Sequence, residues 1–182
     1  MAWTAPMTAI ALDLFTATEY NKYVRDNFLE TAPAKADTSG GLFTVDVANR
    51  IMQRFVGTTT VTAEHRISIC DVTYKDVQSA GPFVTVKTGG KAMVMITAEM
   101  MNSNTNAQAS ASFEISGATT RAASDNWRIT HDGVTGGKWS RQSSCHHVTD
   151  LNAGLNTFRM KYRTGNLGPV HFRRREITVI PF

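Results

Sequence analysis

Residues 109–116 have the sequence Ala109-Ser110-Ala111-Ser112-Phe113-Glu114-Ile115-Ser116, a strict alternation of apolar and polar side chains. Successive side chains of a β-strand point to opposite faces of a sheet, so this pattern predicts a strand. Its alanines, Phe113 and Ile115 are expected to face a core, and its serines and Glu114 to face outward. The stretch therefore favours a sheet protein in which one face of each sheet is buried.

Segments of the same kind occur on both sides of this strand, roughly ten residues apart and separated by turn residues. They are expected at residues 58–69, 83–87, 91–101, 127–131, 138–148 and 173–181, and around Phe158, Met160 and Tyr162. The chain shows no alternation of strands with helices, which argues against a doubly wound sheet. The sequence thus predicts a mainly β fold, an antiparallel jelly-roll-like β-sandwich.

The strand expected at 91–101 is apolar on both faces. One face carries Ala92, Val94, Ile96 and Ala98, and the other carries Met93 and Met95. A strand of this composition is typical of the centre of a sheet that is covered on both sides. The cover on the methionine face is expected to be either a second layer or another subunit.

A single amphipathic α-helix is predicted ahead of the strands, within residues 15–29. Thr16 is a good N-cap and Glu19 follows three residues later, so the two side chains can form a capping box. One helical face carries the side chains of Tyr20, Tyr23, Val24 and Phe28. Pro33 is expected to end the element.

A helix of about four turns is marginal alone in water, so this helix stripe (Tyr20, Tyr23, Val24 and Phe28) needs a partner. The stripe can pack onto the sheet of its own chain, as in an ordinary amphipathic helix. It can also pack against identical helices or a neighbouring subunit. We favour the second alternative and expect the stripe to be an oligomer interface.

Residues 33–57, between the helix and the strands, begin with small and polar side chains and become apolar at Leu42 and Phe43. They are expected to form an extended connector. The apolar residues within 43–55 also fit a second short helix, and periodicity alone does not decide between helix and strand there.

Three parts are therefore expected: a leader with a docking and oligomerising helix (1–32), an extended connector (33–57) and a β-sandwich (58–182). A chain of 182 residues is suited to one compact domain preceded by such an arm.

The composition argues against several classes of protein. Hydrophobic residues make up 42% and charged residues 19% of the chain, as in ordinary globular proteins. No apolar run approaches membrane-spanning length, and residues 1–15 contain none of the basic residues that begin a signal peptide. Two cysteines, Cys70 and Cys145, are too few for a disulfide framework, so reduced thiols are expected.

The formal net charge is +4, and the only basic cluster is Arg173-Arg174-Arg175. On a strand these side chains alternate between faces, so they form no continuous basic stripe. We interpret them as solvated charges that protect a terminal strand. No nucleic-acid partner is expected.

Cys145-His146-His147 is the only group that resembles metal ligands. A strand would place Cys145 and His147 on one face and His146 on the other, which is too few ligands for one ion. The chain has no nucleophile elbow, phosphate loop or dinucleotide motif. We expect no metal, no cofactor, no catalytic residue and no enzyme activity.

Trp127 and Trp139 flank the turn at 132–137 and could stack on sugar rings, although both are more typical of a core. The polar loop 102–106 is a better candidate for a contact surface, because binding residues often lie on loops of a rigid scaffold. The predicted ligand contacts are Asn102, Asn104, Asn106 and Trp139.

Several segments share a family pattern. They are Trp3-Thr4-Ala5-Pro6, Phe15-Thr16-Ala17, Tyr20-Asn21-Lys22-Tyr23-Val24-Arg25-Asp26-Asn27, Pro33-Ala34-Lys35-Ala36 with Gly41-Leu42-Phe43, and residues 84–92, 113–120 and 174–181 of the β-domain. Together they resemble tail-associated structural proteins of phages that infect actinobacteria, which are generally labelled minor tail proteins. The resemblance implies a virion component, with a trimer as the favoured oligomer.

The leading hypothesis is a non-enzymatic, tail-associated virion structural protein, assembled in the host cytoplasm with other virion proteins. We expect a homo-oligomer, with a trimer favoured, and no membrane partner. The alternatives are a capsid decoration protein and a carbohydrate- or receptor-binding tip that contacts a host surface glycan.

Overall fold

The computed structural model describes residues 4–5, 7, 14, 16–31, 35–46, 48–68, 71–105, 107–132, 136–165 and 168–182. The chain divides by its internal contacts into two units, residues 1–55 with Phe182 and residues 56–181. This division lies close to residues 57 and 58, where the connector was expected to meet the sandwich.

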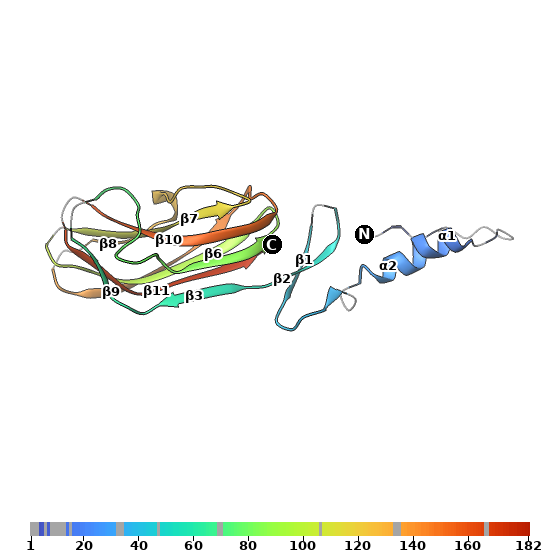
Figure 1. Cartoon of the computed structure of the whole chain (residues 1–182), viewed down its shortest axis with the longest axis horizontal. Coiled ribbons are helices and arrows are strands. Elements are labelled where there is room, and N and C mark those ends of the chain that lie inside the picture. The colour runs from blue at the N-terminus through green and yellow to red at the C-terminus, as the bar shows by residue number, and fades with distance from the viewer. Residues whose placement is uncertain are drawn as a thin grey trace. The chain divides into compact units, whose positions relative to one another are not determined.

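One helix runs through the N-terminal unit in three consecutive pieces (Figure 1): the α-helical α1 (Ala17–Tyr20), the π-helical η1 (Asn21–Arg25) and the α-helical α2 (Asp26–Phe28). The predicted capping box is confirmed. The Thr16 hydroxyl accepts a hydrogen bond from the Glu19 backbone N–H, and the Glu19 carboxylate accepts one from the Thr16 N–H at 2.8 Å. Pro33, the expected end of the element, lies outside the described residues.

The sequence does not decide between helix and strand for residues 43–55, and in the structure this segment contributes to a β-hairpin. Strand β1 (Leu42–Val45) pairs antiparallel with β2 (Ile51–Arg54). Asp46 closes the turn, because its carboxylate accepts hydrogen bonds from the Arg50 side chain and from the backbone N–H groups of Arg50 and Ala48. The Arg50 guanidinium, followed by these N–H groups, lowers the pKa of Asp46 to about 2. A turn stabilised in this way favours a hairpin over a second helix.

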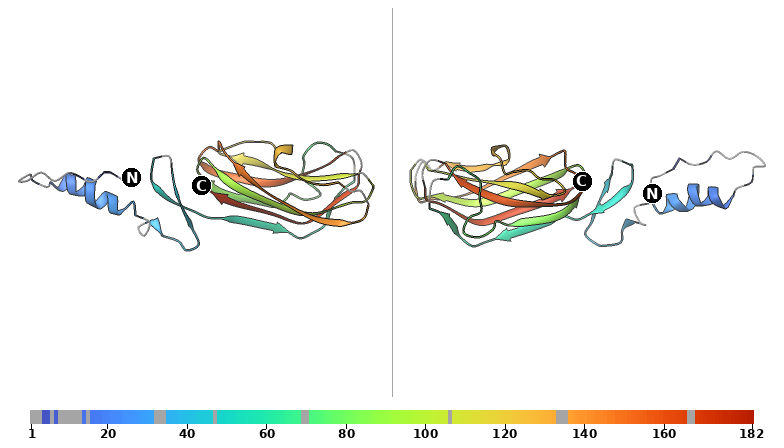
Figure 2. Two further views of the ribbon diagram at one scale, coloured as in Figure 1. Left: turned by 180° about the vertical axis from the view of Figure 1, so that it is seen from behind. Right: turned by 45° about the horizontal axis from the view of Figure 1, so that its top comes forward.

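The second unit is a sandwich of two sheets that pack face to face (Figure 1, Figure 2). The larger sheet has the order β3 (Gly57–Val61), β11 (Val170–Pro181), β6 (Ala92–Asn102) and β9 (Trp139–Val148), and β4 (His65–Ile67) also pairs with β11. The smaller sheet has the order β5 (Phe83–Thr88), β10 (Gly154–Thr164), β7 (Gln108–Gly117) and β8 (Ile129–Asp132). A 3-10 turn, η2 (Asp125–Trp127), precedes β8. All these pairings are antiparallel, so the predicted fold class is confirmed.

The core lies between the two sheets and consists of alternate residues of the long strands. Phe113 of β7 packs on Phe158 of β10 with ring centroids 6.3 Å apart, and Tyr162 packs on Phe172 of β11 at 4.8 Å. These four side chains are fully buried. Burial of apolar area at about 25 cal/mol per Å² is the main term that stabilises such a sandwich.

The polar face of β7 differs from the prediction. Ser110 and Ser112, expected to face outward, are fully buried. Ser112 Oγ donates a hydrogen bond to the backbone carbonyl of Ser124 at 2.7 Å, and Ile115 pairs with Arg121 outside the named strands. The chain that follows β7 therefore returns over this face, and local alternation gives no sign of such a cover.

Strand β6 lies between β11 and β9, which confirms its predicted central position. Its methionine face is only partly covered, since Met95 is 37% exposed and Met93 is half-buried. Among the described residues, no second layer fully covers Met95.

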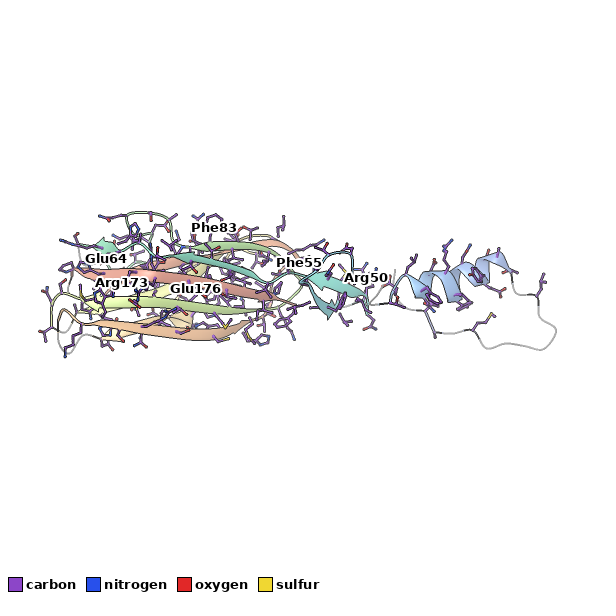
Figure 3. The ribbon with its side chains drawn as sticks, turned by 90° about the horizontal axis from the view of Figure 1, so that it is seen from below. Arg50, Phe55, Glu64, Phe83, Arg173 and Glu176 are labelled. Atoms are coloured by element: carbon purple, nitrogen blue, oxygen red, sulfur yellow. The ribbon has the colours of Figure 1, made fainter. Side chains whose placement is uncertain are left out.

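A β-bulge interrupts β11 at its three consecutive arginines. The register with β6 shifts between Arg173 and Glu176, and Arg174 has a positive φ of 45°. Figure 3 shows Arg173 and Glu176 along this sheet. Arg175, in contrast, is fully buried, and β11 has paired neighbours on both sides. The interpretation of all three arginines as solvated charges on a terminal strand is therefore wrong.

Candidate functional site

The helix of the N-terminal unit exposes large apolar side chains. Phe28 is 70% exposed and Tyr20 50% exposed, while Tyr23 and Val24 are half-buried. Leu29, directly after the helix, is also exposed. Exposed apolar groups that gather in one segment are typical of an interaction surface.

The hairpin adds further exposed apolar side chains. Leu42, Phe43 and Val45 of β1 are all exposed, with Val45 at 66%. A two-stranded hairpin is marginally stable by itself, so these side chains are expected to gain stability from a covering partner. The apolar pair Leu42-Phe43 after Gly40-Gly41 was the sequence signal for them, but they were not predicted as site residues.

The predicted contact loop has two different parts. Asn102 is buried, and its side-chain amide donates hydrogen bonds to the carbonyls of Ala107 and His131, so it holds the loop and is not available to a ligand. This corrects the prediction for Asn102. Asn104 is exposed and donates to the carbonyl of Gly168. Asn106 lies outside the described residues.

Trp139 is half-buried outside the core, at one end of β9. The Arg173 guanidinium lies 3.9 Å from the centroid of its ring, and the His171 ring packs edge-on at 6.4 Å. Trp127 instead stacks on Phe113, with ring centroids 4.7 Å apart, and packs against the core. The expectation of a core position is thus wrong for Trp139, and a cation already occupies one face of its ring.

Glu99 connects the two outward arginines of the bulge. Arg173 Nε and Arg174 Nη1 each donate a hydrogen bond of 2.8 Å to its carboxylate. These bonds, first from Arg173 and then from Arg174, lower the pKa of Glu99. The nearly buried carboxylate thus binds both guanidinium groups, and that of Arg173 also lies over the ring of Trp139.

A histidine that contacts a carboxylate lies beside this group. His171 Nδ1 is 2.8 Å from the Glu64 carboxylate, and His171 Nε2 is 3.2 Å from Ser103 Oγ. The ring of His171 therefore links β11 to the loop that starts at Ser103. This end of the sandwich is a polar surface on which Glu99 is paired with Arg173 and Arg174, and Glu64 contacts His171.

The cysteine and histidines of β9 alternate as predicted. Cys145 and His147 are exposed, whereas His146 is half-buried, accepts or donates a hydrogen bond at Ser144 Oγ and faces Phe113 at 6.0 Å. Among the residues that the structure describes, no three metal-ligating side chains gather in one place. Within the same residues, no helix combines the length and apolar character needed to cross a membrane.

No protein-family model matches this chain, and no curated protein sequence matches it. Its fold is shared with solved structures. A structure of infectious bursal disease virus, Gx strain, superposes with a TM-score of 0.50 at 11% identity, over 76% of this chain and 37% of that chain. Derived T=1 particles of the same virus give a TM-score of 0.50 at 11% identity, over 78% and 36%. The Eiger TNF of S. frugiperda gives 0.48 at 13% identity, over 71% and 92%.

This chain thus spans less than two fifths of the length of those viral proteins. At such low identity the likeness establishes the fold alone. The second unit is an antiparallel jelly-roll-like β-sandwich.

Proposed function

We propose that this chain is a non-enzymatic structural protein of a virus particle, in which the N-terminal unit binds neighbouring chains and the sandwich forms the body. The observation that carries the proposal is a contrast between the two units. The sandwich buries most of its large apolar residues in a core between its sheets, whereas the helix and the hairpin leave most of theirs partly or largely exposed.

The energetics of the helix stripe favour association. Burial of Tyr20, Tyr23, Val24 and Phe28 in an interface contributes several kcal/mol at roughly 25 cal/mol per Å² of apolar area. Part of this gain offsets the entropy lost on association. In a closed ring each identical contact adds the same free energy of burial to the oligomer. A symmetric homo-oligomer, a trimer in this proposal, therefore suits the stripe.

Two further observations support a virion role. The sandwich shares its fold with structures from a virus. Segments along the chain resemble minor tail proteins of phages that infect actinobacteria, which favours a position in the tail over capsid decoration. The copy number per particle, measured by quantitative mass spectrometry of purified virions, separates these positions: a tail protein is present in few copies and a decoration protein in very many.

The first test is the mass of the full chain at micromolar concentration, measured by native mass spectrometry. We expect an oligomer, and we expect the double substitution Tyr23→Ser with Phe28→Ser to convert it to a monomer with an unchanged β-type circular dichroism spectrum. The matched control is Val72→Ser with Leu155→Ser, which removes two exposed apolar side chains from the sandwich. A monomeric parent, or an oligomer that survives the change in the helix, would refute the proposal.

A further inference from the structure

Arg175 carries a guanidinium group into the interior of the sandwich. The residue is 0% exposed, and its Nε, Nη1 and Nη2 atoms have no hydrogen-bond acceptor among the described residues. An unpaired buried cation costs several kcal/mol, so buried arginines normally face a counter-charge. A group that accepts hydrogen bonds and carries negative charge would offset this cost.

The polar groups around Arg175 are donors as well. The guanidinium lies over the ring of Tyr162, 5.3 Å from the ring centroid, and the Tyr162 hydroxyl is buried without a partner. Burial raises the pKa of Tyr162 by more than the adjacent Arg175 guanidinium lowers it, so the hydroxyl keeps its proton. This group therefore offers an O–H to the same region.

His65 contributes a further donor. His65 pairs with Phe172 of β11, the strand that also carries Arg175. The Nδ1 atom of His65 is buried without a hydrogen-bond partner. Its Nε2 lies 3.3 Å from Ser79 Oγ. A hydroxyl that donates to Nε2 leaves the hydrogen of a neutral imidazole on Nδ1. Burial, and then the charge of Arg175, lower the pKa of His65, which keeps the ring neutral.

The nearby carboxylate of Asp76 does not neutralise the guanidinium. Its oxygens accept hydrogen bonds from Lys161 Nζ at 2.9 Å and from the Gly81 N–H at 3.3 Å. It forms no ion pair with Arg175 among the described residues. The positive charge of Arg175 is thus left without a partner from this acidic side chain.

We propose that Arg175, Tyr162 and His65 form an internal binding site for a small monovalent anion such as chloride. Because Arg175 and Tyr162 are fully buried, a small ion is the expected occupant. The three residues supply N–H and O–H donors, which an anion accepts and a cation would not. Arg175 belongs to β11 and Tyr162 to β10, so an anion held by both links the two sheets beside the bulge.

The bulge is what makes the site. Without the register shift between Arg173 and Glu176, strict alternation would place Arg173 and Arg175 on the same face. With the shift, Arg173 faces Glu99 outside while Arg175 enters the core. The inserted residue therefore directs the side chain of Arg175 into the core, where it can bind the anion.

The test measures the midpoint of thermal unfolding of the full chain in sodium chloride and in sodium gluconate at equal ionic strength, with tryptophan fluorescence as the readout. An anion that binds only the folded state raises the midpoint by about 3–6 °C for each tenfold rise in chloride above its Kd. A series in sodium formate distinguishes a halide from a small carboxylate. An equal midpoint in chloride, formate and gluconate would overturn the proposal.

Variants assign the effect to the site. Arg175→Met, which keeps the length of the side chain and removes its charge, is expected to abolish the difference between chloride and gluconate. Tyr162→Phe removes one hydroxyl and is expected to reduce it. Arg66→Met removes a charge from the exposed residue next to His65. This variant is expected to leave the difference between chloride and gluconate unchanged. A chloride response that persists in full without the Arg175 guanidinium would contradict the proposal.

Replacement of chloride by bromide locates the ion directly, and this experiment does not require any variant to fold. Crystals of the full chain grown in sodium bromide are expected to show an anomalous peak within hydrogen-bond distance of the Arg175 guanidinium. Density at that position with no anomalous signal identifies a buried water, which would refute the anion site.

Discussion

Asn27 holds Thr4 through a pair of opposed hydrogen bonds. The Thr4 N–H donates to Asn27 Oδ1 at 2.9 Å, and Asn27 Nδ2 donates to the Thr4 carbonyl at 2.8 Å. The same amide also donates to the Tyr23 carbonyl at 3.0 Å. Asn27 thus pairs with the backbone of Thr4 as a neighbouring strand would, and it connects Thr4 to the helix across 23 residues of sequence.

Substitution of Asn27 by Asp is expected to release the leader. The carboxylate can still accept from the Thr4 N–H, but it cannot donate to the two carbonyls, and it repels them. The loss is about 1–3 kcal/mol for the hydrogen bonds involved. Hydrogen exchange measured by NMR is expected to show faster exchange of the Thr4 amide. Thr18→Ala, at an exposed helix position, is the control and is expected to leave that amide protected.

The ion pairs of Glu99 predict an acid-sensitive component of stability. Because the folded pKa of Glu99 lies below its ordinary value of 4.5, this component is complete above pH 4.5 and is lost as the pH falls through the folded pKa. Glu99→Gln is expected to lower the unfolding midpoint at neutral pH and to reduce its fall on acidification. Thermal unfolding at neutral and acidic pH measures both effects. Glu176→Gln, on the neighbouring strand β11, is the control, and an identical acid response in the two variants would contradict the prediction.

The strands could be predicted from the sequence because alternation is local. Phe113 and Ile115 face the core as their spacing indicates, and the Thr16–Glu19 box begins the helix at the predicted residue. The burial of Ser112 depends on a segment that returns from Ser124, which no local pattern records.

The candidate site was harder to predict for the same reason. The orientation of Arg175 depends on a single inserted residue in β11. A prediction based on strict alternation does not indicate where such a bulge occurs. Asn102 and Trp139 were chosen for their chemistry and their position near turns. Their environments come from contacts with His131 and Arg173, which are distant in sequence.

The burial of His146 predicts a second dependence of folding stability on pH, at higher pH than that of Glu99. Burial lowers its pKa from 6.5, so the unfolded chain binds the proton more tightly than the folded chain. The stability that results is complete above pH 6.5 and decreases as the pH falls below it. His146→Gln is expected to lose less stability than the parent between pH of about 7.5 and about 5.5, as measured by urea unfolding. His147→Gln, at an exposed position, is expected to behave as the parent does, and a similar change in both variants would argue against burial as the cause.

Gly117 and Gly137 form a matched pair for testing how the sandwich closes at the end of β7. Both have positive φ values, 105° and 82°, which a side chain adopts at a cost of about 1–2 kcal/mol. A Cβ at Gly117 would also collide with the Leu155 carbonyl oxygen of the neighbouring β10, whereas a Cβ at Gly137 would meet nothing within 4 Å. Gly117→Ala is therefore expected to lose about 1–3 kcal/mol more than Gly137→Ala, because the backbone of β10 must shift. Urea unfolding of the two variants measures the difference, and equal losses would show that β10 yields to the added methyl group without cost.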